Sequence, residues 1–82
     1  MKHLAEIIEI IQDISGMEKE ELTNDVVINE SDITSITLLE IIATVESTLK
    51  LELLQEDMDI TKYDTLGELF EAFERAEDNG NK

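Results

Sequence analysis

The amino-acid sequence predicts an all-α protein, a small bundle of three to four helices with a long first loop. Apolar residues recur at helical spacing in three separate segments, a period of about 3.6 residues that strands do not produce. The chain has no proline and only three glycines, so the tight turns that a small sheet needs are scarce. Its 82 residues suffice for one hydrophobic core but not for two.

The first predicted helix leads into the long loop. Its apolar stripe consists of Leu4, Ile7, Ile8, Ile11 and Ile14. The helix should end at Ser15, because Gly16 suits the left-handed residue that closes a helix. Residues 17–32 show no sustained period and many turn formers, which indicates a connecting loop. Residues 26–28, Val-Val-Ile, could form a strand, but such a strand would lack a partner, so we expect them to pack beneath the loop.

The second helix is expected to run from Thr34 or Ser35 to Leu49. Its main apolar stripe comprises Leu38, Ile41, Ile42, Val45 and Leu49, and the stripe is widened by Ile36, Leu39 and Ala43. Apolar side chains therefore cover more than half of the circumference. This breadth predicts a central helix that other elements contact on several sides.

The last part of the chain contains a second link and a third helix. Residues 51–64 are irregular in pattern, with one helical turn expected near residues 58–62. Thr65 and Glu68 have the spacing of a capping box, and the helix that follows has an apolar stripe of Leu66, Leu69, Phe70, Phe73 and Ala76. The final segment is polar. We therefore assign residues 1–77 to a single domain and residues 78–82 to a frayed tail.

Charge and composition exclude several classes of function. Twenty-one acidic residues against six basic ones give a formal net charge of −15, which repels nucleic acid and anionic lipid and attracts basic protein surfaces. The longest uncharged stretch, residues 33–39, is too short to cross a membrane. Glu6 and Glu9 follow the N-terminus too closely for a signal peptide. We therefore expect a cytoplasmic protein.

Catalysis is not expected. The chain has no cysteine, and its single histidine, His3, lies near one end. Ser35 has no histidine close to it in sequence and no Gly-x-Ser-x-Gly turn around it. The many carboxylates do not single out one acid–base pair. The sequence therefore favours a protein that binds or carries something over an enzyme.

Residues 57–68 partly match the calcium-binding loop of an EF-hand. The ligand positions of that loop are filled by Asp57, Asp59, Thr61, Tyr63, Thr65 and Glu68. Lys62, however, stands where the loop requires glycine, and there is no second hand. We expect no bound metal. A calcium-binding acidic module remains one alternative function, and an acidic helical interaction protein without a prosthetic group is another.

Three segments resemble the acyl carrier proteins and the related peptidyl carrier domains. They are EELTND at residues 20–25, SITLLEIIATVESTLKLEL at 35–53 and YDTLGELFEAF at 63–73, and the resemblance covers residues 2–76. It implies a bundle of acyl-carrier type in which Ser35 carries 4′-phosphopantetheine. The family usually has aspartate before this serine, where this chain has Thr34.

The alternative for the same segment is a purely structural one. Serine and threonine are common N-cap residues, so Ser35 or Thr34 could simply cap the second helix. Two further hydroxyls are weaker candidates for modification. Ser31 lies ahead of the helix, and Ser47 lies inside it, where access is expected to be restricted.

The resemblance also implies a function and partners. A carrier would hold an acyl or aminoacyl group as a thioester and present it to enzymes of fatty acid, polyketide or related biosynthesis. Its partners would be a phosphopantetheinyl transferase with coenzyme A, and acyl-loading and acyl-using enzymes with basic patches. Glu40 and Glu46 would dock these enzymes, and a monomer is expected. Leu38, Ile42 and Val45 could line a cleft for an apolar cargo or could simply belong to the core, and the sequence is compatible with both.

Overall fold

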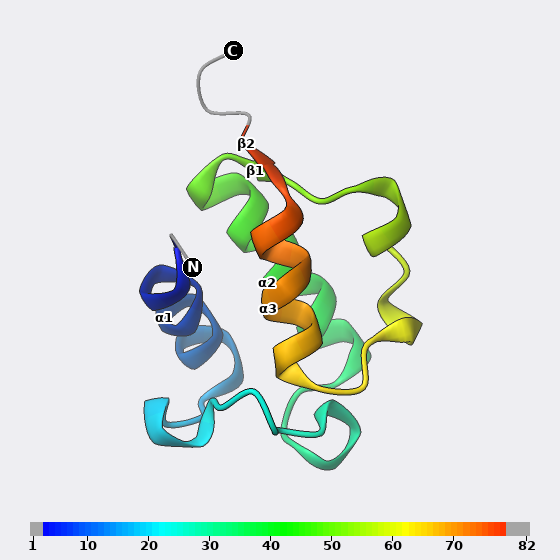
Figure 1. Cartoon of the computed structure of the whole chain (residues 1–82). Helices are drawn as coiled ribbons and strands as arrows, with labels where there is room; N and C mark the ends of the chain where they lie inside the picture. The colour runs from blue at the N-terminus through cyan, green and yellow to red at the C-terminus, as the bar shows by residue number, and fades with distance from the viewer. Residues whose placement is uncertain (1–2, 79–82) are drawn as a thin grey trace.

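The computed structural model describes residues 3–78 and shows three helices packed around one core (Figure 1). The helices are α1 (Leu4–Ser15), α2 (Ser35–Leu49) and α3 (Leu66–Arg75). Short 3₁₀ turns interrupt both links: η1 (Lys19–Glu21) and η2 (Ile28–Glu30) in the first, η3 (Gln55–Asp57) and η4 (Ile60–Lys62) in the second. The predicted helical bundle with a long first loop is confirmed.

The helix ends follow the local signals in the sequence. Gly16 adopts a left-handed conformation with φ of 79°, and its N–H donates to the carbonyl of Gln12 at 2.9 Å. Thr65 and Glu68 form the predicted capping box: the Glu68 carboxylate accepts from the Thr65 N–H at 3.0 Å. The expected helical turn before α3 is η4, whereas η3 had no clear signal in the sequence.

The core is assembled from one face of each helix. On α2 the fully or largely buried residues are Leu38, Ile41, Ile42 and Val45, which lie on a single stripe. Ile36 and Leu39 are 72% and 53% exposed, and Ala43 is exposed as well. The prediction that α2 is contacted on several sides is therefore wrong. Its partners cover one face, and the widened part of the apolar stripe faces solvent.

The first loop is pinned to the start of α3 by the backbone. Val27 and Thr65 form an antiparallel bridge. The Ile28 N–H donates to the carbonyl of Asp64 at 2.9 Å, and the Leu66 N–H donates to that of Val26 at 3.0 Å. The expectation that this apolar segment would lack a strand partner is thus wrong. Ile28 is buried beneath the loop as predicted, but Val27 is exposed.

A second short pairing holds the C-terminal part of the described chain. Strand β1 (Leu51–Glu52) runs antiparallel to strand β2 (Glu77–Asp78), with Leu51 opposite Asp78. The sequence places Asp78 in a frayed tail, but its backbone is paired in this two-residue ladder. The rest of the predicted tail, residues 79–82, lies outside the described residues, and the division into residues 1–77 and 78–82 remains a prediction.

A buried carboxylate ties the second link to α3. The Asp57 side chain is 1% exposed and accepts hydrogen bonds from Arg75 Nη2 at 2.8 Å and from Lys62 Nζ at 2.6 Å. These two cations, Arg75 foremost, lower the pKa of Asp57 to about 2. Tyr63 adds a hydrogen bond from its hydroxyl to the Asp57 carbonyl. The link is therefore fixed to the third helix by charge as well as by packing.

We predict that Asp57→Asn destabilises the fold by about 1–3 kcal/mol, between the values for breaking an exposed and a buried ion pair. Both cations are more than a third exposed, so water can partly replace the lost carboxylate. Urea unfolding followed by circular dichroism would measure the change. The control is Glu56→Gln, which neutralises the neighbouring exposed carboxylate and should leave stability within about 0.5 kcal/mol. If the two substitutions lowered the free energy of unfolding equally, the ion pairs of Asp57 would not be a specific source of stability.

The contribution of Asp57 should also depend on pH. Its pKa is lower in the folded chain, at about 2, than the ordinary value of 3.8, so the unfolded chain takes up the proton first as pH falls. The stabilisation is then complete above about pH 4 and disappears as the pH approaches about 2. The gap in melting temperature between the wild type and Asp57→Asn should narrow over that range. A melting-temperature gap that stays constant from pH 7 to pH 2 would show that the ionised Asp57 carboxylate does not stabilise the folded chain.

Candidate functional site

Thr34 caps the N-terminus of α2. Its Oγ1 accepts a hydrogen bond from the Thr37 N–H at 3.1 Å, and its backbone carbonyl accepts the first helical bond, from the Leu38 N–H at 2.8 Å. The Thr34 hydroxyl in turn donates to Thr37 Oγ1 at 3.0 Å. Of the two hydroxyl residues that could cap this helix, Thr34 is therefore the one that does so.

Ser35 is left as the first residue of α2 with an exposed side chain. Its hydroxyl makes no hydrogen bond to any residue that the structure describes, and the same holds for the backbone N–H groups of Ser35 and Ile36. Unpaired N–H groups at a helix N-terminus carry partial positive charge and favour a bound anion. The position thus combines an accessible hydroxyl with donors suited to a phosphate.

The other two candidate serines, Ser31 and Ser47, are less suited than Ser35 to carry a phosphate. Ser31 Oγ donates to the carbonyl of Ile28 at 2.8 Å and accepts from the Ile33 N–H at 3.1 Å, so this hydroxyl is used within a turn. Ser47 is exposed, contrary to the expectation of restricted access. It lies in the last turn of α2, however, where the helix dipole disfavours a phosphate.

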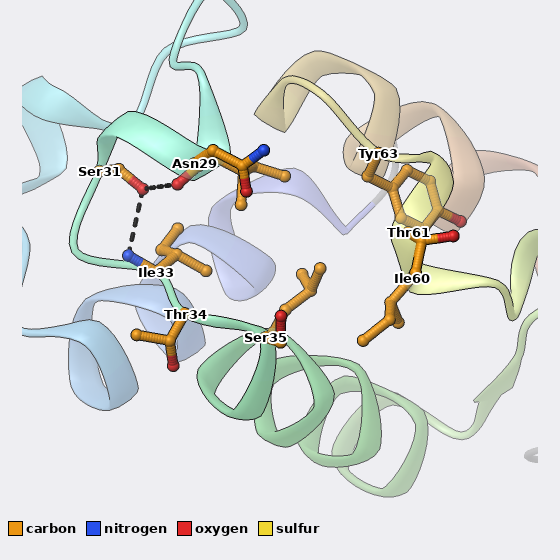
Figure 2. Close-up of a pocket in the computed structure, with 10 residues that line it drawn as sticks. Asn29, Ser31, Ile33, Thr34, Ser35, Ile60, Thr61 and Tyr63 are labelled. Carbon is orange, nitrogen blue, oxygen red and sulfur yellow. Dashed lines mark hydrogen bonds between the residues drawn. The ribbon is translucent and has the colours of Figure 1, made fainter.

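A cleft of about 440 Å³ opens beside Ser35 (Figure 2). Its floor is formed by buried side chains from the first loop, α2 and the second link, namely Ile28, Ile33, Leu38 and Tyr63. Polar side chains, including Thr34 and Thr61, and the half-buried Ile60 line the rest. Of the three predicted cleft residues, Leu38 lies in this lining. Ile42 and Val45 do not line this cleft and belong to the buried core.

The second link supplies cleft residues that the sequence analysis did not assign. Ile60, Thr61 and Tyr63 line the side opposite the first loop. A signal was present, because Ile60 and Tyr63 are the apolar residues of the segment 59–64, which ends just before the capping box. Their spacing alone does not show that the link folds back toward α2.

The two predicted docking carboxylates differ in their surroundings. Glu40 is exposed on the polar face of α2. Glu46 is half-buried, and its Oε2 accepts a hydrogen bond from the Leu53 N–H at 3.0 Å. This bond holds the chain after α2, which leaves the helix through Lys50 in a left-handed conformation with φ of 56°. Glu46 therefore has a role within the fold that the sequence pattern did not indicate.

The EF-hand-like positions do not converge on a metal site. Asp57 is paired with two cations, and Glu68 serves the capping box. The Asp59 carboxylate accepts from the N–H and hydroxyl of Thr61 at 3.0 and 2.6 Å, which lowers its pKa. Between residues 3 and 78, no group of three or more histidine, cysteine or acidic side chains is placed to hold a metal ion.

Comparison with known proteins gives one match. A family model described as "Phosphopantetheine attachment site" matches residues 5–73, a span that includes α2, the cleft and most of α1 and α3. Neither the curated proteins nor the solved structures give a significant match. Within the part of the chain that the structure describes, no helix has the length and apolar character needed to cross a membrane.

We predict that Thr34→Ala destabilises the fold by about 1 kcal/mol, the usual cost of losing an N-cap. For a domain of this size that corresponds to a melting temperature lower by about 4–8 °C. Thr34→Ser, which keeps the acceptor oxygen, should be close to neutral. The matched control is Thr48→Ala, at an exposed position of the same helix, which should not lower the melting temperature. If Thr34→Ala melts at the wild-type temperature, the cap is not formed in solution.

Proposed function

We propose that this chain, which belongs to the phosphopantetheine attachment-site family, carries its prosthetic group on Ser35. Carrier domains of this family are not catalytic: they hold a covalent 4′-phosphopantetheine and interact with a phosphopantetheinyl transferase and with acyl-handling enzymes. What remains to be assigned in this chain is the attachment residue, the cargo and the surface that partners recognise.

The observation that supports Ser35 is its free hydroxyl beside a capped helix start. Thr34 satisfies the Thr37 N–H, so Ser35 is not needed for the cap. The transferase would move the phosphopantetheine group from coenzyme A to the Ser35 oxygen, forming a phosphodiester. In this step the pyrophosphate link of coenzyme A breaks, adenosine 3′,5′-bisphosphate leaves, and the Ser35 hydroxyl loses its proton. The unpaired N–H groups of Ser35 and Ile36 are the chain's own donors for that phosphate, and the positive end of the helix dipole adds to their effect.

The cargo would travel as a thioester on the thiol of the attached arm. We infer an acyl or aminoacyl group that is passed between enzymes of fatty acid, polyketide or related biosynthesis. Apolar portions of the arm or cargo would rest against Leu38 and the other buried residues that floor the cleft. Deeper residues of the predicted cleft, Ile42 and Val45, would be reached only if the core opened.

Docking is proposed to be electrostatic. A net charge of −15 draws in enzymes with basic patches and accelerates the encounter. Glu40 is exposed on α2, the helix that also carries Ser35, so a partner bound there would have the arm within reach. Glu46 is the weaker of the two predicted contacts because its carboxylate is already bound to the Leu53 N–H. The carrier would act as a monomer in these encounters.

We predict that incubation with coenzyme A and a phosphopantetheinyl transferase raises the intact mass of the chain by one phosphopantetheine. Ser35→Ala should abolish the increase, because the acceptor oxygen is removed while the Thr34 cap stays. The matched control is Ser47→Ala, which removes an exposed hydroxyl from the same helix and should be modified like the wild type. Modification of Ser35→Ala would rule out this attachment site. A wild type that several transferases leave unmodified would favour the acidic interaction protein without a prosthetic group.

We predict that Glu40→Lys leaves the fold intact but slows acyl transfer by the cognate enzyme roughly tenfold at low salt, because an attractive contact becomes repulsive. The defect should shrink as salt screens the charges. Glu71→Lys is the control, since it changes the net charge equally at an exposed position on α3. Steady-state kinetics over a salt series would measure both variants. Equal slowing by the two would indicate a general charge effect in place of a contact at Glu40.

A further inference from the structure

We propose that Tyr63 closes the cleft beside Ser35 toward the core, so that this carrier holds a short acyl or aminoacyl group and does not bury a long chain. The inference rests on the proposed attachment at Ser35 and adds a cargo class and a residue that sets it. Its basis is the position of Tyr63 at the boundary between the cleft and the core.

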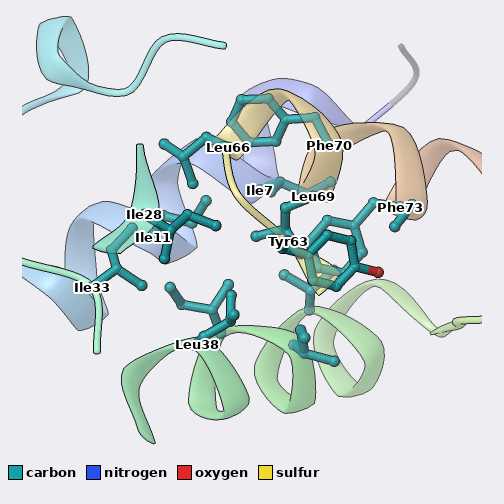
Figure 3. Close-up of a cluster of buried hydrophobic side chains, with 14 of the residues drawn as sticks. Ile7, Ile11, Ile28, Ile33, Leu38, Tyr63, Leu66, Leu69, Phe70 and Phe73 are labelled. Carbon is teal, nitrogen blue, oxygen red and sulfur yellow. The ribbon is translucent and has the colours of Figure 1, made fainter. Parts of the chain in front are cut away.

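Tyr63 belongs to both the cleft lining and the buried core. Its side chain is only 5% exposed, and Figure 3 shows its ring between α2 and α3. Val45 and Leu69 are fully buried in the core, and neither is among the residues that line the cleft. A chain that enters from Ser35 therefore meets a wall of packed side chains in place of a tunnel.

The ring is held in place at its polar end. The Tyr63 hydroxyl donates to the backbone carbonyl of Asp57, and the Asp57 carboxylate is bound to Lys62 and to Arg75 of α3. Burial raises the pKa of Tyr63 to about 12, so the hydroxyl remains a donor at all ordinary pH values. The hydrogen bond and the ion pairs thus fix the ring relative to the third helix.

Displacing the ring would be costly. It would remove the hydrogen bond and leave a buried carbonyl without that partner, in addition to disturbing a close-packed core. The aliphatic floor residues can change rotamer at lower cost, because they have no polar group like the Tyr63 hydroxyl that is bound to Asp57. A long alkyl chain would consequently stay largely in water, at a cost that rises with each methylene. A short or polar cargo avoids that cost.

The test uses the absence of cysteine from the chain. Ser35→Cys provides a single thiol at the cleft, which iodoacetamides with an ethyl or a dodecyl group will alkylate without any transferase. In this protein we expect the methyl NMR signals of Ile42 and Val45 to be the same for both adducts, and the melting temperatures to agree within about 2 °C. Shifted Ile42 and Val45 methyl signals in the dodecyl adduct would overturn the proposal.

A second pair of variants isolates the role of Tyr63. In Ser35→Cys with Tyr63→Leu, the dodecyl group should enter the core, shift both methyl signals and raise the melting temperature by about 4 °C or more over the ethyl adduct. Tyr63→Phe keeps the ring but removes the hydroxyl that holds it, so it should shift the two methyl signals less than Tyr63→Leu does and more than the parent. If the dodecyl group stays outside in a folded Tyr63→Leu variant, Tyr63 is not the barrier. If that variant does not fold, the adducts of the parent still decide whether long chains are excluded.

The proposed function and this inference can fail separately. A chain that no transferase modifies at Ser35 would refute the attachment while leaving the alkylation experiment readable. A chain that is modified at Ser35 and also buries the dodecyl group would uphold the attachment and refute the restriction to short cargo.

Discussion

One hydrogen bond, from the Thr37 N–H to Thr34 Oγ1, determines where α2 begins, and the site depends on that boundary. Because Thr34 is the cap, Ser35 becomes the first helical residue and keeps its hydroxyl free. The same boundary places Leu38 one turn later, in the floor of the cleft. The family usually has aspartate where this chain has Thr34. Either residue can accept the capping bond, so the substitution preserves the arrangement that exposes the serine.

The opposite wall of the cleft depends on a different interaction. Asp57 binds one cation from its own link and one from α3, and its carbonyl receives the Tyr63 hydroxyl. These contacts fix the second link where it can face the start of α2. The interactions that stabilise this part of the chain therefore also shape the cleft beside Ser35. If Ser35 carries the group as proposed, a change at Asp57 would affect stability and the space for the cargo together.

The features that the sequence predicts well are local ones. Gly16 and the Thr65 capping box can be found because their signals lie within a single helix turn. The exposure of Ile36 and Leu39 could not be predicted from helical periodicity, since a broad apolar stripe does not show which of its parts the neighbouring helices cover. The ion pairs of Asp57 were also missed, because its partner Arg75 is 18 residues away in sequence. Of the candidate site, the position of Ser35 at the start of α2 was predictable, and the wall opposite it was not.

Whether the Thr34 cap leaves Ser35 to carry the prosthetic group can be decided by locating the modification within the chain. After modification by a transferase, proteolysis and fragment-ion mass spectrometry assign the phosphopantetheine to one residue. We expect it on Ser35, with one group per chain. Phosphopantetheine on Thr34, Ser31 or Ser47 would contradict this expectation, because each of those assignments requires a hydroxyl that the structure uses within a cap or turn, or places at the wrong end of the helix.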